Sequence, residues 1–160
     1  MNEEPDIVCS ATLMVLGDDL IPEKITEQIG LEPNQSWRRG ERKSFIRNDG
    51  TVHYFDDVHE WGGWKCFIPK KHEALELEEM LAWWCDLLEG RESQMRELEG
   101  QGYWLEMNCF VAMSETVTIE VSADLQQRLA SFRLNLSIRF SPDALTSSGA
   151  AEQFAQADRE

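Results

Sequence analysis

The chain has 160 residues and 42% of them are hydrophobic, which suits one packed domain and excludes a wholly disordered chain. Thirty acidic residues outnumber 15 basic ones and give a net charge of −15, which excludes general binding to nucleic acid or to anionic membranes. No run of about 18 apolar residues is present, so the sequence predicts no transmembrane helix.

The N-terminus and the cysteines both favour a cytoplasmic location. Residues 1–6 are acidic where a secretion signal would be basic and then apolar. The cysteines lie in apolar stretches and none belongs to a CxxC pair, so we expect reduced, buried thiols at Cys9, Cys66, Cys85 and Cys109.

The first half of the chain alternates between strand and turn patterns. Residues 7–17 are apolar on both faces, as expected of a central strand, and a helix is predicted from Pro22 until Gly30. Residues 32–40 have the composition of a loop. Residues 43–47 and 51–55 should form a hairpin, because the Asp49-Gly50 pair supplies the backbone conformation of its turn. A further strand is expected over 64–68.

The second half begins with a long helical pattern over residues 72–100. Gly90 lies in its middle, so we expect two helices or one kinked helix. A strand over 103–113 follows, which residues 117–121 extend or pair with as a hairpin. Ser122 should cap a helix that runs through Phe132, and 134–140 form the last strand. Residues 1–6 are then an N-terminal extension, 7–140 a single domain and 141–160 a flexible acidic tail.

Together these elements predict an α+β fold, with one mainly antiparallel sheet of five to seven strands and helices packed chiefly on one face. Residues 20–29 and 120–129 share a pattern, in which a strand leads through a turn into a short helix. Each helix carries an apolar pair at i and i+4. This similarity suggests two related halves, although such short elements can also match by chance.

Several landmarks follow one another along the chain. They are 11–13 (Ala-Thr-Leu), 17–20 (Gly-Asp-Asp-Leu), 25–33, 36–41 (Ser-Trp-Arg-Arg-Gly-Glu), Gly63-Trp64, the acidic Leu-rich helix and Cys109-Phe110. Their order and spacing resemble the bacterial family catalogued as domain of unknown function 4279, over roughly residues 7–140. The resemblance implies a compact bacterial α+β domain and no established activity, and it makes a place near toxin and immunity genes plausible. The chain departs from the family pattern in its acidic helix and in its tail beyond Phe140.

One basic segment stands out in this acidic chain. Residues 38–47 hold five basic residues and one acid, next to Trp37. Arginine forks bind carboxylates or phosphates, and an indole stacks on a guanidinium or on a ligand ring. We therefore consider Trp37, Arg38, Arg39 and Arg42 as candidate ligand-binding residues. The alternative is structural, with Trp37 anchoring the loop on the core and the arginines pairing with Asp18, Asp19 or the acidic helix.

Signals for metal binding or catalysis are weak. His53, Asp56, Asp57 and His59 lie within seven residues, but their spacing matches no strong metal signature, and an exposed hairpin edge explains them. The chain has none of the common nucleophile, phosphate-binding, dinucleotide-binding or zinc-protease motifs. We predict no cofactor, no metal and no catalytic residue, while an undetected enzyme remains a third alternative.

The helical region 73–99 carries nine acids and two arginines. Such a surface is usually only solvated, but it also suits docking of a basic protein. The chain has six tryptophans, and Trp83 and Trp84 point about 100° apart on this helix, so both need not be in the core. We expect a non-catalytic protein-binding domain, for example of an immunity type, in which Glu78, Glu79, Trp83 and Asp86 contact the partner. The alternative is a small-anion site in the Trp-Arg-Arg loop.

Overall fold

The computed structural model describes residues 7–142, with β1 (Ile7–Gly17) at the centre of a five-stranded sheet. β1 is apolar on both faces and pairs on both edges, antiparallel to β5 (Gly62–Cys66) and to β6 (Trp104–Met113). The outer strands are β2 (Gln35–Trp37), antiparallel to β5, and β7 (Asn135–Ser141), parallel to β6. The strand order is therefore β2-β5-β1-β6-β7, and a separate hairpin is formed by β3 (Arg42–Ile46) and β4 (Val52–Val58).

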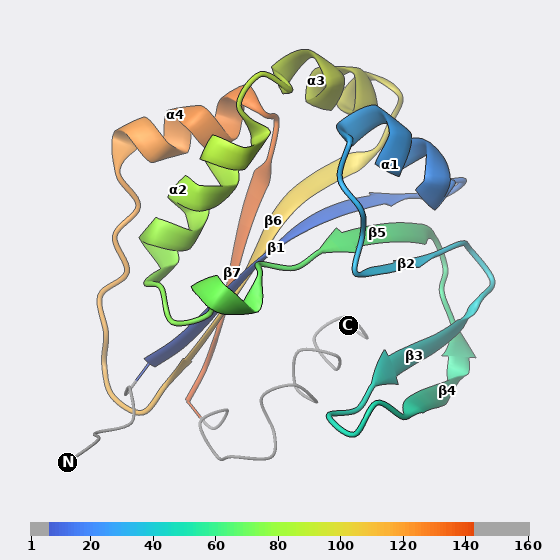
Figure 1. The fold of residues 1–160 in the computed structure, drawn as a ribbon, viewed down its shortest axis with the longest axis horizontal. Coiled ribbons are helices and arrows are strands. Elements are labelled where there is room, and N and C mark those ends of the chain that lie inside the picture. The colour runs from blue at the N-terminus through green and yellow to red at the C-terminus, as the bar shows by residue number, and fades with distance from the viewer. Residues whose placement is uncertain (1–6, 143–160) are drawn as a thin grey trace.

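Four helices pack on one face of the sheet (Figure 1). They are α1 (Pro22–Ile29), α2 (Leu77–Leu88), α3 (Glu92–Gly100) and α4 (Ala123–Ser131), and a 3₁₀ turn (Lys70–His72) precedes α2. The odd-numbered residues of β1 from Cys9 to Val15 contact this layer together with Trp64 of β5 and Met107 of β6. The prediction of an α+β fold, with a mainly antiparallel sheet and helices on one face, is confirmed.

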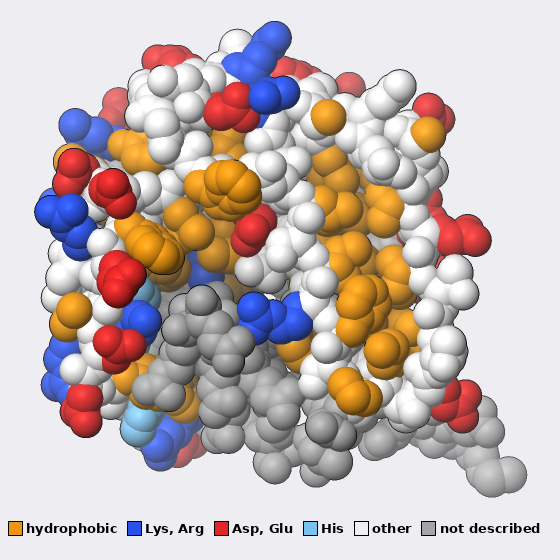
Figure 2. Space-filling view, turned by 180° about the vertical axis from the view of Figure 1, so that it is seen from behind, with side chains coloured by type: hydrophobic (Ala, Val, Ile, Leu, Met, Phe, Trp, Pro, Cys, Tyr) orange, Lys and Arg blue, Asp and Glu red, His pale blue; other side chains and the backbone are white. Residues whose placement is uncertain are grey.

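The other side of the sheet, which we call the open face, is not covered by any helix of the described residues. The even-numbered residues of β1 from Val8 to Leu16 point to it. Figure 2 shows this side, where hydrophobic side chains gather over much of the surface. Contiguous apolar surface of this kind is typical of binding sites.

Both halves of the chain contain a helical crossover between parallel strands. β1 and β2 both pair antiparallel with β5, so they run parallel to each other, and α1 lies in the connection between them. β6 and β7 pair directly with each other in parallel, and α4 lies in the connection between them. The similar segments 20–29 and 120–129 lead into these two helices, and each buries its apolar pair, Ile25 with Ile29 and Leu125 with Leu129. The arrangement is consistent with two related halves.

Glycines end the helices where the sequence predicts. Gly30 caps α1 in the left-handed conformation with φ of 81°, and Gly90 separates α2 from α3 with φ of 86°. The helical pattern therefore forms two helices. Ser122 caps α4, because its hydroxyl accepts a hydrogen bond from the Leu125 amide at 3.2 Å.

Two predictions of local structure are wrong. The segment 32–40 is not all loop, because Gln35–Trp37 forms β2. Residues 117–121 form no strand, although Ile119 and Val121 pack on the core, because β7 occupies the edge of β6 that such a strand would need. Residues 1–6 and 143–160, which include most of the predicted tail, lie outside the described residues.

The four thiols are free. Burial raises the pKa of Cys85 to about 11 and that of Cys109 to about 12, so both are neutral and unreactive at pH 7. Within residues 7–142, none of the helices has the length and apolar character needed to cross a membrane.

Candidate functional site

Trp37 fastens the edge strand β2 to the open face. Its side chain is only 7% exposed and lies directly on Gly63 of the neighbouring strand, where any Cβ would overlap with the indole. Its Nε1 donates a hydrogen bond to the Trp61 carbonyl at 3.0 Å, and its ring stacks on His59 with centroids 4.4 Å apart. The indole is therefore an anchor with three contacts, and its faces are not free to stack on a ligand.

A buried lysine lies beside this anchor. Lys65 is 5% exposed, and its Nζ lies 5.4 Å from the centroid of the Trp37 ring. Burial lowers its pKa to about 8, and the nearby carboxylate of Glu106 partly opposes this shift. Lys65 was not predicted as a site residue, although a single lysine between Trp64 and Cys66 in an apolar strand was a usable signal.

His59 stays neutral at physiological pH. Burial and the charges of Lys43 and Lys65 lower its pKa to about 4, against the opposite effect of Asp57. Two ammonium groups therefore act on the same imidazole in a chain of net charge −15. Lys43 also pairs with Asp57 at 3.0 Å, so the positive charge at this junction is partly balanced.

The loop arginines point to different partners. Arg38 forms an exposed ion pair with Glu23 at 2.9 Å, which ties the loop to α1. Arg42 donates to the Phe55 carbonyl at 3.1 Å and lies over the Tyr54 ring, within the hairpin, while Arg39 is exposed. The structure gives Arg38 and Arg42 roles in holding the loop and the hairpin, and it does not bring them together around one ligand position.

The hairpin residues considered for a metal separate in the same way. The ring of His53 packs against Phe45 and Phe55, whereas His59 stacks on Trp37. Asp57 pairs with Lys43 at 3.0 Å. Among the residues that the structure describes, no three His, Cys, Asp or Glu side chains come close enough to hold a metal ion.

The outward side of α2 forms a continuous stripe. Glu79, Trp83, Asp86 and Glu89 recur at spacings of four and three, and we call them the acidic stripe. The opposite side of the helix, which includes Leu77, Met80, Leu81, Trp84 and Leu88, is buried. Trp83 is half-buried against His72 and Trp84, with ring centroids 5.2 and 5.0 Å away. Glu78, the remaining predicted partner residue, is half-buried beside the stripe.

Two residues of the acidic stripe also have partners within the chain. The Glu79 carboxylate accepts a hydrogen bond from the Glu76 amide at 3.3 Å and completes a capping box at the start of α2. Asp86 pairs with Arg128 of α4 at 2.6 Å. Glu89 has no such pair among the described residues.

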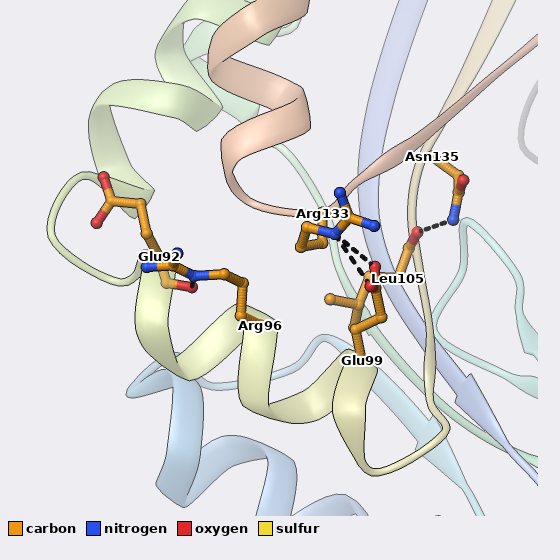
Figure 3. Close-up of polar contacts among 6 residues, drawn as sticks. All are labelled: Glu92, Arg96, Glu99, Leu105, Arg133 and Asn135. Atoms are coloured by element: carbon orange, nitrogen blue, oxygen red, sulfur yellow. Dashed lines mark hydrogen bonds and ion pairs between the residues drawn. The ribbon is translucent and has the colours of Figure 1, made fainter.

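A second acid–arginine contact fixes the end of the helical layer. Arg133 follows α4 with φ of 58° and donates from Nε to both carboxylate oxygens of Glu99, at 3.0 and 2.9 Å (Figure 3). The nearby Arg96 donates to the backbone carbonyl of Glu92, and Asn135 donates to that of Leu105, so neither neutralises a carboxylate there. The arginines thus organise the layer, while most of its acids remain available to a partner.

These features define a small α+β protein with a helical layer on one face of its sheet, an acidic stripe on that layer and an opposite sheet face that no helix within residues 7–142 covers. The family model of the domain of unknown function DUF4279 matches residues 7–143, and the chain belongs to this family. No curated protein and no solved structure matches the chain. The match carries no activity with it, so the proposals below depend on the geometry.

Proposed function

We propose that the protein is a non-catalytic binding protein that docks a basic protein partner through the acidic stripe of α2. The observation that carries this proposal is the placement of a partly exposed indole, Trp83, among three exposed carboxylates. Tryptophan is the residue type most enriched in binding hot spots, and the surrounding carboxylates favour a cationic partner and speed its association. An immunity-type role in the bacterial cytoplasm, where an acidic protein blocks a basic toxin, is the most concrete form of this function.

The charges of the helical layer support a basic partner. α2, α3 and the turn between them carry seven acids, and the only bases in that span are Arg91 and Arg96. Arg91 donates to the backbone carbonyls of Ile29 and Leu87, and Arg96 to that of Glu92. Both arginines donate to backbone carbonyls and not to carboxylates, so the surface of α2 and α3 keeps its excess of negative charge.

The test is capture of partners from a bacterial lysate by the wild-type protein and by two triple variants with the same charge change. In the stripe variant, Glu79→Gln, Asp86→Asn and Glu89→Gln remove three charges, and the glutamine side chain introduced by Glu79→Gln can still complete the capping box. In the control variant, Glu32→Gln, Glu41→Gln and Asp56→Asn remove three charges elsewhere on the surface.

We expect a basic protein that the wild type and the control retain, and that the stripe variant loses. The same protein should elute when salt is raised to about 0.5 M, where the screening length falls to a few ångströms. Retention by all three proteins, or loss from both variants alike, would show that the stripe is not the interface. Trp83→Ala should weaken the complex further, by about 1–2 kcal/mol or more.

A second candidate function is binding of a small anion at the junction of the hairpin and the sheet. The observation that favours it is the pair of ammonium groups, Lys43 and Lys65, that act on His59 next to the Trp37 loop. Thermal stabilisation by phosphate or by small carboxylates would test it. Loss of that stabilisation in Arg38→Ala/Arg39→Ala would assign the anion to the loop, and loss in Lys65→Met alone would assign it to the open face.

A further inference from the structure

A shallow hollow lies on the open face, at the corner where β1 ends. It has a volume of about 290 Å³ and is lined by Leu16, Gly17, Asp18, Trp61, Gly102 and Trp104. The two indoles are unusually accessible, with exposed fractions of 46% for Trp61 and 52% for Trp104. Neither tryptophan belongs to the acidic stripe or to the Trp37 loop, so the hollow is a separate feature.

The strand register explains how the hollow forms. Leu16 pairs with Gly63 on one side and with Trp104 on the other, and the last pair of β1 and β5 joins Gly17 to Gly62. Trp61 directly precedes that pair on its strand. The two tryptophans therefore flank β1 from both sides, and their strands are separated by two strand spacings, or about 10 Å between backbones across the sheet. Gly102 also lines the hollow, and no atom lies within 4 Å of the position that its Cβ would take, so this residue leaves the space open.

The chemistry of the lining favours a cation. A cation is attracted to an indole when it lies within about 6 Å of the ring. Trp61 and Trp104 line the same hollow, so an ion held there can contact both indoles. Asp18 is the charged residue of the lining, and its carboxylate is exposed. Next to the hollow, Trp104 donates from Nε1 to the Glu106 carboxylate at 3.4 Å, which holds one edge of its ring. Lys65 lies near this carboxylate and partly balances its charge, so Asp18 is the acid available to a ligand in the hollow.

We propose that this hollow binds an organic cation, such as a methylated ammonium or a guanidinium, between Trp61 and Trp104 with Asp18 as its counter-ion. An anion would meet the Asp18 carboxylate and the negative faces of the indoles. A neutral apolar ligand would contact the same rings but gain nothing from Asp18. The hollow lies on the opposite side of the sheet from α2, so this proposal does not depend on the protein partner proposed above.

The experiment titrates the protein with choline and, separately, with its neutral isostere 3,3-dimethylbutan-1-ol, and follows the indole N–H signals by NMR. N-acetylarginine amide serves as a third probe, because a guanidinium could also come from a peptide side chain. We expect one or both cations to shift the signals of Trp61 and Trp104 and to bind about fivefold or more tightly than the neutral isostere. The cation that binds more tightly indicates whether the natural ligand carries an ammonium or a guanidinium.

Variants separate the contributions. Asp18→Asn should weaken choline or arginine binding about fivefold, and Trp61→Ala or Trp104→Ala at least about threefold. Phe67→Ala removes an exposed aromatic side chain outside the hollow and should leave this binding unchanged. Equal binding of choline and its neutral isostere to the wild-type protein, or unchanged affinity in Asp18→Asn, would overturn the proposal. The comparison of choline with its isostere needs no variant, so a variant that fails to fold does not weaken the test.

Discussion

The indole of Trp37 occupies the space above Gly63 that a side chain would otherwise fill. These two residues are paired across β2 and β5, and a Cβ on Gly63 would overlap with the indole ring. β2 has only three residues, so its backbone pairing alone is weak. The contact of an indole with a glycine therefore explains why so short an edge strand is held in place.

Gly63→Ala should destabilise the protein by about 2–4 kcal/mol, because the methyl group forces the indole away from the sheet and disturbs its hydrogen bond to Trp61. Chemical denaturation followed by tryptophan fluorescence measures this loss. Gly100→Ala is the matched control, since nothing lies within 4 Å of a Cβ there and the residue ends α3. The control should be neutral or slightly stabilising, and equal losses in the two variants would refute the explanation.

Trp84→Phe should cost about 2–4 kcal/mol of unfolding free energy. Trp84 is fully buried, and its Nε1 donates to the Ala11 carbonyl of the central strand at 2.9 Å. Phenylalanine removes this donor and leaves a small cavity, so both an unsatisfied carbonyl and lost packing contribute. Trp83→Phe, one residue earlier on the helix surface, should cost less than about 1 kcal/mol in the same urea titration.

His59 should make the protein less stable as the pH falls from about 6.5 to about 4. Its pKa in the folded state is about 4, below the usual 6.5, so over this range the unfolded chain binds a proton that the folded protein does not. The stabilising effect of neutral His59 is complete above pH 6.5. Because the imidazole is only partly buried, water screens the effect, and its loss amounts to about 1–2 kcal/mol. His59→Phe keeps a ring to stack on Trp37 and cannot titrate, so its stability should fall less over this range than that of the wild type.

The sequence predicts most elements of the fold because their signals are local. The apolar run along 7–17, the Asp49-Gly50 turn and the break at Gly90 each depend on neighbours in the chain, and the structure confirms all three. The sequence does not predict β2, because the strand conformation of these residues comes from pairing with β5 and from the contact of Trp37 with Gly63. Residues 117–121 alternate like a strand, but β7 already occupies the only available edge of β6.

The candidate sites are harder to predict from the sequence, because most of them depend on contacts between segments that are distant in the chain. The acidic stripe can be read from α2 alone, since its spacing follows from one helix. The burial of Lys65 and the hollow between Trp61 and Trp104 depend on which strands are neighbours, and the sequence alone does not determine that order. The pairing of Arg38 with Glu23 joins residues that a pattern search assigns to separate elements.

The ion pair between Asp86 and Arg128 gives the most direct test of how the acidic stripe is used. The two side chains are 70% and 40% exposed, so water screens their attraction and Arg128→Gln should change stability by less than about 0.5 kcal/mol. The same change removes the cation that competes with a partner for Asp86. A basic protein recovered through the stripe should therefore bind Arg128→Gln about twofold to fivefold more tightly than the wild type, as measured by calorimetry at low salt. Arg133→Gln, whose partner Glu99 lies on α3, is the matched control and should leave the affinity nearly unchanged. Weaker binding in Arg128→Gln would mean that Arg128 itself contacts the partner, and the interface would then have to include an acidic group of that partner.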